Sequence, residues 1–217
     1  MNKKNYILCI LFIITYKVTS AQSWKNPSEK YKNAYKKYTD AKCPIRQESI
    51  VHFVYFSKGR KSIKNHPFLN HPAFKGAQIM YAWKDLEPEK GQYDFSMIKA
   101  DIAYLKRHNK KLFIQLQDAT FNPKYNAVPT YLLTTEYDGG AVLQYNDNGV
   151  HNGWLAKRWN KKVRERFALL LKALGKEFDG IIEGINLQET SIGISKERDS
   201  TFTEELYIQG IKKICCA

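Results

Sequence analysis

Apolar and polar positions follow two different periods along this chain, one typical of buried strands and one typical of helices. Short runs rich in apolar, β-branched or aromatic residues predict strands, and apolar positions three or four residues apart predict helices. The predicted strands cover residues 50–56, 77–83, 111–117 and 181–190. The clearly predicted helices cover residues 95–108, 159–178 and 203–214. We interpret this order as four consecutive strand–helix units.

Strands that alternate with helices predict a parallel α/β sheet covered by helices, because parallel strands need a crossover connection. An open doubly wound sheet and part of a closed eight-stranded barrel both satisfy this order. The turn after the first strand, residues 56–60, lacks the glycine spacing of dinucleotide-binding and phosphate-binding loops. The barrel is therefore favoured, and no cofactor is expected.

Polar and aromatic residues gather where the predicted strands end. Trp83 closes the second strand, Gln117 and Asp118 close the third, and Glu189 lies at the end of the fourth. In (β/α)8 barrels the chemistry sits at this carboxyl end of the strands. Trp83, Gln117 and Asp118 are therefore predicted substrate contacts, and Glu189 is the predicted catalytic carboxylate.

The long connection over residues 118–158 is rich in aromatic side chains, including Trp154. Loops of this length are usually functional or disordered. Flat aromatic rings suit the apolar faces of sugars, so Trp154 is a candidate substrate contact. The alternative is that these rings only pack the loop onto the domain.

Three segments resemble a known family in their order along the chain. Residues 76–95 (GAQIMYAWKDLEPEKGQYDF) look like the second strand and following loop of retaining glycoside hydrolases with a (β/α)8 barrel, especially the β-galactosidase-like and related families. Residues 128–132 (VPTYL) and 174–180 (LGKEFDG) continue the resemblance, which covers residues 50–215. Within the first segment, the acidic-Pro step at Glu87 is interpreted as a structural turn.

The resemblance implies a carbohydrate substrate and gives Glu189 the role of general acid/base. A glycosidic oxygen leaves poorly until it is protonated, so a carboxylic acid must donate to it, and a second carboxylate acts as nucleophile in the retaining mechanism. In these families the nucleophile comes from the seventh strand. The family usually has Asn directly before the acid/base, whereas here Gln188 stands there and the nearest Asn is Asn186. Asn186 and Gln188 are both predicted sugar contacts.

The length limits how much of a barrel this chain can form. A complete barrel takes about 250 residues, and only four of its eight units are predicted here. We therefore expect the N-terminal half of a TIM barrel, a truncated form that lacks the nucleophile and is inactive alone. Two alternatives remain open: a non-catalytic carbohydrate-binding protein, and an interaction protein that self-associates through the open edges of the half barrel.

The N-terminus and the charge complete the expectation. Residues 1–21 combine a basic start with an apolar stretch too short to span a bilayer, which predicts a secretory signal peptide and a periplasmic or extracellular protein. A basic extension (22–48) and the partial barrel domain (49–217) follow. Removing residues 1–21 takes away three lysines and no acid, so the formal net charge falls from +14 to +11.

The remaining lysines are dispersed, so we expect no nucleic-acid partner, and no membrane contact after signal cleavage. The cysteines show no metal-ligand spacing, so no metal site is expected.

Overall fold

The computed structural model describes residues 29, 31–38, 50–188 and 192–215. The chain divides into two units, Met1–Ser49 and Ile50–Ala217. In the first unit the described residues form a short 3-10 helix, η1 (Ala34–Tyr38), preceded by an exposed ion pair between Glu29 and Lys32. In the part of the chain that is described, no helix is long and apolar enough to cross a bilayer. The predicted signal segment lies outside the described residues.

The second unit alternates strands with helices. Its parallel strands are β1 (His52–Tyr55), β2 (Phe74–Ala82), β3 (Lys111–Gln117) and β6 (Gly184–Leu187). Its α-helices are α2 (Trp83–Leu86), α3 (Ser96–Lys106), α4 (Lys161–Phe178) and α5 (Glu204–Cys215). Short 3-10 helices occupy the connections: η2 (Arg60–Ile63), η3 (Pro67–Asn70), η4 (Thr130–Leu132) and η5 (Thr135–Tyr137). The strands β4 (Ala141–Tyr145) and β5 (His151–Ala156) form a separate antiparallel hairpin.

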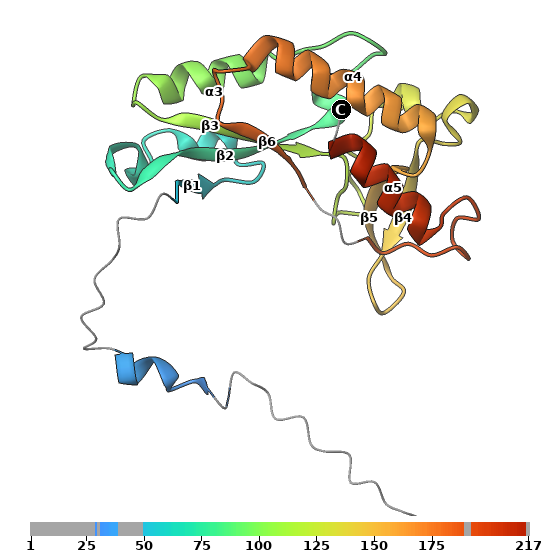
Figure 1. Ribbon diagram of the computed structural model, residues 1–217, viewed down its shortest axis with the longest axis horizontal. Coiled ribbons are helices and arrows are strands. Elements are labelled where there is room, and N and C mark those ends of the chain that lie inside the picture. The colour runs from blue at the N-terminus through green and yellow to red at the C-terminus, as the bar shows by residue number, and fades with distance from the viewer. Residues whose placement is uncertain (1–28, 30, 39–49, 189–191, 216–217) are drawn as a thin grey trace, which may run out of the picture. The chain divides into compact units, whose positions relative to one another are not determined.

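The four parallel strands lie in the order β1-β2-β3-β6, which is also their order along the chain. Figure 1 shows α3 and α4 lying along one face of this sheet, with α5 and the hairpin at one end. A parallel four-stranded sheet alternating with helices confirms the predicted fold class, one half of a (β/α)8 architecture.

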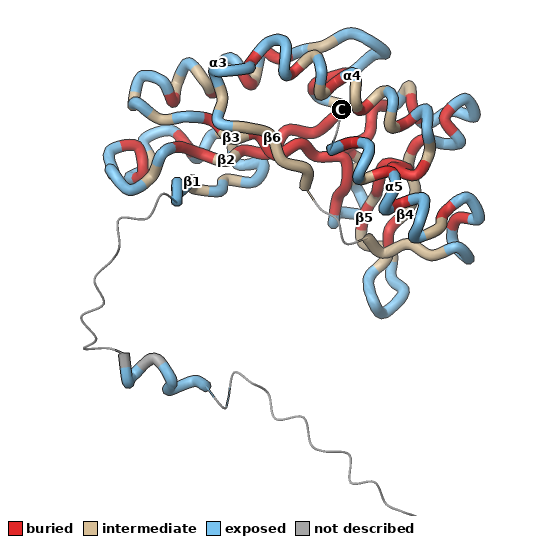
Figure 2. The backbone as a smooth tube through the Cα atoms, in the orientation of Figure 1, coloured by how far each residue is buried: buried red, intermediate tan, exposed pale blue. Residues whose placement is uncertain are grey.

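The main core lies between the sheet and these two helices. Because side chains of a strand alternate between its two faces, every second residue of β2 and β3 enters this core: Ala77, Ile79, Tyr81, Leu112, Ile114 and Leu116. The intervening residues lie on the opposite side, which we call the inner face: Tyr55, Gln78, Gln115, Gln117, Asn186 and their neighbours in register. Figure 2 shows the buried backbone concentrated along β2 and β3. The sheet therefore has an apolar helical side and a polar inner side.

Local sequence explains where the helices begin. Asn160 accepts hydrogen bonds from the backbone N–H groups of Lys162 and Val163, so α4 begins at Lys161 and not at the predicted residue 159. Asp94, which directly precedes the N-cap residue Phe95 of α3, accepts from the N–H of Ser96 over 2.8 Å. The predicted helices 95–108 and 203–214 are confirmed within two residues.

Two predictions are wrong in detail. The fourth strand is only Gly184–Leu187, because the N–H groups of Ile181 and Ile182 bond to Phe178 O and close a turn there. The connection over residues 118–158 is also more regular than expected, since it contains the β4–β5 hairpin.

The hairpin is fixed to the sheet by a close backbone approach. The N–H of Thr120 donates to Trp154 O over 2.7 Å, just beyond the end of β3. A Cβ atom at Gly153 would lie 1.7 Å from Thr120 O, so only glycine fits between the two segments. The hairpin is therefore built onto the end of the third strand.

We predict opposite effects for the same substitution at two glycines. Gly153→Ala lowers the free energy of unfolding by about 1–3 kcal/mol, because the backbone must move away from the methyl group. Gly175→Ala in α4 raises it by about 0.5–1 kcal/mol, since nothing lies within 4 Å of the added Cβ and alanine favours the helix. Urea unfolding followed by circular dichroism measures both. Equal effects at the two positions would contradict this packing.

A second prediction concerns acid stability. Burial acts to raise the pKa of Asp199, but hydrogen bonds from Lys157 and Thr201 outweigh it and hold the pKa below its ordinary 3.8. The folded state therefore keeps the carboxylate charged more readily than the unfolded state does. The stability from this group is present above pH 3.8 and is lost as pH falls through the folded pKa.

Asp199→Asn should therefore cost about 1–2 kcal/mol at neutral pH and much less well below the ordinary pKa. Urea midpoints measured across the acid range test this, with the exposed Asp147→Asn as the control. A loss that is the same at every pH would show that Asp199 contributes packing and not charge.

Candidate functional site

The ends of the four parallel strands meet along one side of the sheet, which we call the carboxyl edge. It is formed by the residues that follow each strand: Phe56, Trp83, Asp118 and Gln188. A small pocket of about 90 Å³ lies there, beside the ends of β2 and β3. Its lining consists of Lys58, Arg60, Met80, Tyr81, Ala82, Asp85, Met97, Gln117 and Tyr125.

Several amide side chains lie on the inner face of the sheet, below the carboxyl edge. Tyr55 Oη donates to Gln115 Oε1 over 2.8 Å, which joins β1 to β3 across the intervening strand. Gln78 Nε2 donates to Asn186 Oδ1 over 3.0 Å, which joins β2 to β6 in the same way. Asn186, a predicted sugar contact, is therefore held on the inner face by Gln78. These hydrogen bonds satisfy the polar side chains of the inner face, which is therefore unlike the apolar core on the helical side of the sheet.

Gln117 and Gln188 lie next to each other at the top of this face. Leu116 pairs with Leu187 in the sheet, so the residues that follow them stand at the same level on adjacent strands. Both side chains have a buried Oε1 atom that accepts no hydrogen bond from the described residues. A buried acceptor without a partner costs about 1–3 kcal/mol. Two residues at one level on adjacent strands thus each carry an unsatisfied acceptor, which we call the acceptor pair.

Glu189 itself lies outside the described residues, as do the two residues after it. The described chain stops at Gln188 and resumes at Ile192. Directly afterwards, Gly193 O accepts a hydrogen bond of 2.9 Å from the N–H of Tyr145 in the hairpin. The residues on either side of Glu189 are therefore held, one by the sheet and the other by the hairpin.

Two lysines flank an aromatic ring on the other side of the pocket. The Nζ atoms of Lys58 and Lys84 lie 3.5 and 4.0 Å from the centre of the Tyr125 ring. Burial lowers the pKa of Lys58, Asp85 opposes that change, and Lys84 adds to it. Burial, with a contribution from Asp85, raises the pKa of Tyr125 to about 12, so its hydroxyl stays protonated at neutral pH. Lys58 and Tyr125 line the pocket together with Asp85, which accepts a hydrogen bond from the Tyr125 hydroxyl, and with Gln117.

Trp83 does not line the site, which corrects its prediction as a substrate contact. Its side chain is fully buried, and its ring meets Phe167 edge to face at 4.8 Å. Its indole N–H donates to Glu87 Oε2 over 2.9 Å, and Glu87 also binds Gly91 N and Arg166. The ring has no face free for a sugar. Glu87 belongs to a structural turn, as the sequence indicated.

Asp118 is also removed from the predicted sugar contacts. It is buried and receives two short hydrogen bonds from Arg158, Nε to Oδ2 at 2.7 Å and Nη2 to Oδ1 at 2.6 Å. Arg158 Nη1 further donates to Tyr207 Oη over 2.9 Å. Asp118 therefore acts as a structural anion inside the domain.

Trp154 lies in β5 of the hairpin and is partly exposed. Its indole N–H donates to Pro123 O over 2.9 Å, and its ring meets His151 edge to face. It is not among the residues that line the carboxyl-edge pocket. Of the predicted substrate contacts, Gln117, Asn186 and Gln188 share the inner face of adjacent strands β3 and β6, and only Gln117 lines the pocket, whereas Trp83 and Asp118 are committed to buried partners and Trp154 lies in the hairpin.

The sequence interpretation missed Lys58 and Lys84 altogether. Lys58 lies three residues beyond β1 and Lys84 lies two residues beyond β2, so the strand-end rule that selected Gln117 also applied to them. Tyr125 belonged to the aromatic connection but carried no signal of its own. Within the described residues, no group of three His, Cys, Asp or Glu side chains is arranged to hold a metal ion.

Solved protein structures resemble this chain in fold, at low sequence identity. No family model and no curated protein sequence matches this chain. A variant of the GH5_18 protein of Bifidobacterium longum subsp. longum, solved with Manβ1-4GlcNAc, is similar at a TM-score of 0.52 and 11% identity over 76% of this chain. The β-amylase catalytic domain of Paenibacillus polymyxa has a TM-score of 0.47 at 13% identity over 64% of this chain. The β-galactosidase of Rahnella sp. R3 has a TM-score of 0.42 at 16% identity over 64% of this chain.

This chain spans 40%, 38% and 21% of those three proteins, respectively. The structures that resemble it are glycoside hydrolases, and the GH5_18 likeness establishes a partial barrel fold.

We predict that Asp118 and Arg158 are strongly coupled. Asp118→Leu and Arg158→Met each cost about 3–5 kcal/mol of unfolding free energy, because each leaves a buried charge unpaired. The double variant costs much less than the sum, since both charges are gone. Urea unfolding of the four proteins gives the coupling energy. The exposed pair Lys90–Glu136 provides the control cycle, with an expected coupling of about 0.2–1 kcal/mol, and additive losses at Asp118 and Arg158 would contradict the assignment.

Proposed function

We propose that this protein is a glycoside hydrolase-like protein that binds a poly- or oligosaccharide at the carboxyl edge. Glu189 serves as general acid/base toward an O-glycosidic bond. The observation that carries the proposal is the pair of buried amide oxygens of Gln117 and Gln188, which find no partner among the described residues. Sugar hydroxyls are donors that would satisfy both oxygens at once.

The immediate surroundings support a sugar as the ligand. Lys58, Tyr125, Asp85 and Gln117 all line the pocket, so it offers donors as well as acceptors. A hydroxyl group both donates and accepts, so a polyol matches this mixture better than a purely anionic or apolar molecule does. Gln188 directly precedes Glu189, where its amide would contact the sugar hydroxyl next to the reacting carbon.

The chemistry assigned to Glu189 has two steps. As an acid it protonates the departing glycosidic oxygen, and as a base it then takes a proton from the water that cleaves the glycosyl intermediate. The nucleophile must be another carboxylate about 5–5.5 Å away. Asp118 does not serve, because Arg158 holds both of its oxygens. A retaining reaction would therefore take its nucleophile from outside the four strands described.

Binding tests the acceptor pair directly. Titration calorimetry of the full chain with gluco-, galacto- and manno-oligosaccharides should find at least one ligand, and Gln117→Ala or Gln188→Ala should weaken it by about 3- to 10-fold. Gln92→Ala is the matched control, because that amide is exposed and bonds only to nearby Glu89 among the described residues. If no oligosaccharide binds, or if all three variants bind alike, the proposed site is wrong.

Hydrolysis tests the role of Glu189 separately. This chain alone is expected to bind without hydrolysis, whereas in a complete barrel that supplies the nucleophile, release of the aryl group from the matching aryl glycoside should fall about 100-fold or more on Glu189→Ala. Added azide should restore part of the rate, because it needs no general base. Binding without hydrolysis by the complete barrel as well would support the alternative of a non-catalytic carbohydrate-binding protein.

A further inference from the structure

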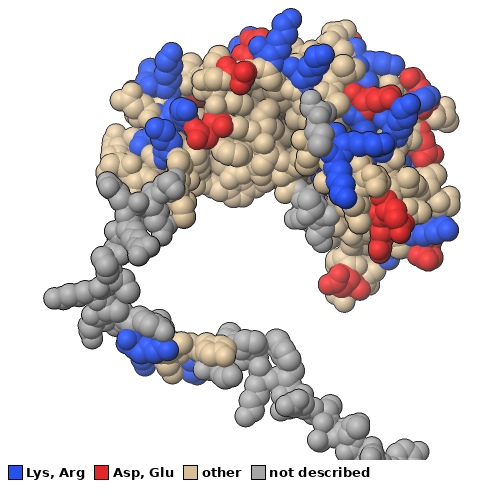
Figure 3. Space-filling model, in the orientation of Figure 1, with Lys and Arg blue, Asp and Glu red and all other residues tan. Residues whose placement is uncertain are grey.

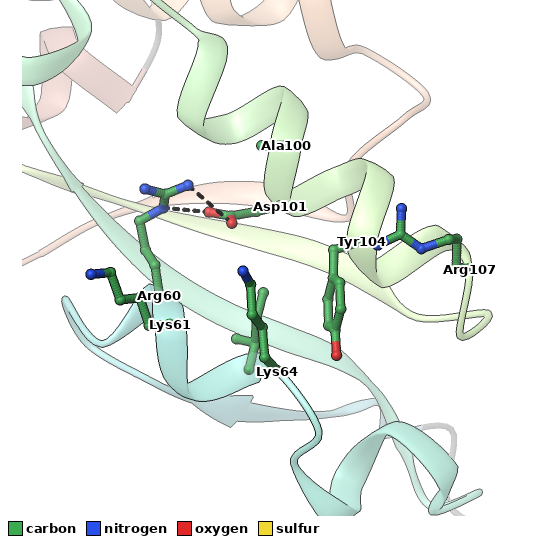
Figure 4. Close-up of a pocket in the computed structure, with 8 residues that line it drawn as sticks. Arg60, Lys61, Lys64, Ala100, Asp101, Tyr104 and Arg107 are labelled. Carbon is green, nitrogen blue, oxygen red and sulfur yellow. Dashed lines mark hydrogen bonds and ion pairs between the residues drawn. The ribbon is translucent and has the colours of Figure 1, made fainter.

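A second pocket lies on the helical side of the sheet, between η2 and α3. It has a volume of about 450 Å³, within the usual range for small-molecule sites. Figure 4 shows its polar lining, which we call the basic pocket: Arg60, Lys61, Lys64, Asp101, Tyr104 and Arg107. Ala100 also lines the pocket, and its small side chain leaves the space open.

The single acid of this pocket is already neutralised. Arg60 donates to Asp101 through Nε and Nη2, at 2.6 and 3.0 Å, and Tyr81 Oη donates to the same carboxylate over 2.7 Å. Lys61, Lys64 and Arg107 are exposed and take part in no ion pair with the described residues. The pocket therefore presents three cations that no neighbouring acid in the described chain balances.

The frame that carries these cations is fixed at two points. The Arg60–Asp101 pair joins η2 to the middle of α3. Further along, the N–H of Asn65 donates to Tyr104 Oη over 2.9 Å, and the Arg107 guanidinium lies 5.2 Å from the centre of the Tyr104 ring. Cations around a pocket create a positive potential in it, so an anion that enters is stabilised without rearranging the backbone.

The cationic side chains of the basic pocket are suited to an oxyanion as the ligand. The guanidinium of Arg107 is a planar fork suited to two oxygens of one anion, and the long, exposed side chains of Lys61 and Lys64 carry ammonium groups that are free to turn toward an anion in the pocket. A sulfate or phosphate ester group presents at least three such oxygens. The volume of about 450 Å³ leaves room for the sugar ring that carries the ester.

Nucleic acid fits this arrangement less well. A nucleic-acid backbone requires a run of cations along a groove, whereas these three cations line one pocket together with Asp101 and Tyr104. Figure 3 shows lysine and arginine side chains spread over the visible face with acidic groups among them, and not as a continuous stripe.

We propose that the basic pocket binds a sugar unit bearing a sulfate or phosphate ester. It is a second ligand site, separate from Glu189 and the acceptor pair, and it does not require hydrolysis. It would give a strongly basic protein a specific contact with an anionic glycan.

The test compares two triple variants of equal charge. In the first, Lys61, Lys64 and Arg107 are each replaced by Gln. In the control, three exposed lysines of α4, Lys162, Lys172 and Lys176, are each replaced by Gln. Circular dichroism confirms that both are folded. Titration calorimetry then uses glucose 6-sulfate, glucose 6-phosphate, glucose and inorganic sulfate as ligands, and a short DNA duplex is added as a competing polyanion.

We expect at least one of the two sugar esters to bind and glucose not to bind. The pocket variant should weaken the ester by about 10-fold or more, while the α4 variant stays within about 2-fold of the unaltered protein. The ester that binds more tightly identifies sulfate or phosphate as the natural group. The proposal is overturned if both triple variants lose equal affinity, if neither ester binds, or if inorganic sulfate binds as tightly as the sugar esters. It is also overturned if the pocket variant loses DNA binding alone.

Discussion

The buried pair of Asp118 and Arg158 is the interaction on which the carboxyl edge depends. Asp118 lies one residue beyond β3, and Arg158 lies between the hairpin and α4, so their two hydrogen bonds close a loop of the chain onto the sheet. Arg158 also reaches Tyr207 in α5. A Cβ atom at Gly210 would lie 2.3 Å from Arg158 O, so α5 approaches this backbone closely. One ion pair thus holds a strand, a hairpin and two helices together.

This anchor explains how neighbouring residues acquire opposite roles. Gln117 and Asp118 are adjacent in sequence, yet one is directed to the inner face and the other is held among buried groups by Arg158. The alternation of a strand sets this division. Because Asp118 is fixed, the direction of Gln117 is fixed too, and its amide oxygen is presented to the carboxyl edge. The buried position of Asp118 and the inner-face position of Gln117 therefore both result from the way β3 ends.

The sequence was sufficient for the order of the sheet and for most element positions. The third strand occupies residues 111–117 as predicted, because its apolar run stands between clear polar boundaries. Residues 181–183 misled the prediction, since an apolar turn and an apolar strand look alike until their hydrogen bonds are known. Asn148-Gly149 between two apolar segments was a recognisable hairpin signal that the interpretation as an aromatic loop passed over.

Site residues were harder to predict than elements. Trp83 and Asp118 were correctly placed at strand ends, but their partners Glu87, Phe167 and Arg158 decide which way they point. Phe167 and Arg158 lie far from them along the chain, where no local pattern reveals the contact. Gln117 was predicted from its position at a strand end and Gln188 from its place directly before Glu189 in the family resemblance, and both remain predicted contacts. The position of a residue along a strand can thus be predicted from the sequence. Whether its side chain bonds to a residue far away in the chain cannot.

The close contact between the hairpin and the segment after β6 sets limits on how this chain can diverge. A Cβ atom at Gly193 would lie 1.6 Å from Tyr145 O, so every other amino acid displaces the hairpin. The tip of the same hairpin, residues 146–150, is exposed and carries no such contact with the described chain beyond Arg198 near Gly149. Homologous chains should therefore vary in length at the tip and keep glycine at position 193. A fusion or label inserted at the tip would leave the segment containing Glu189 undisturbed.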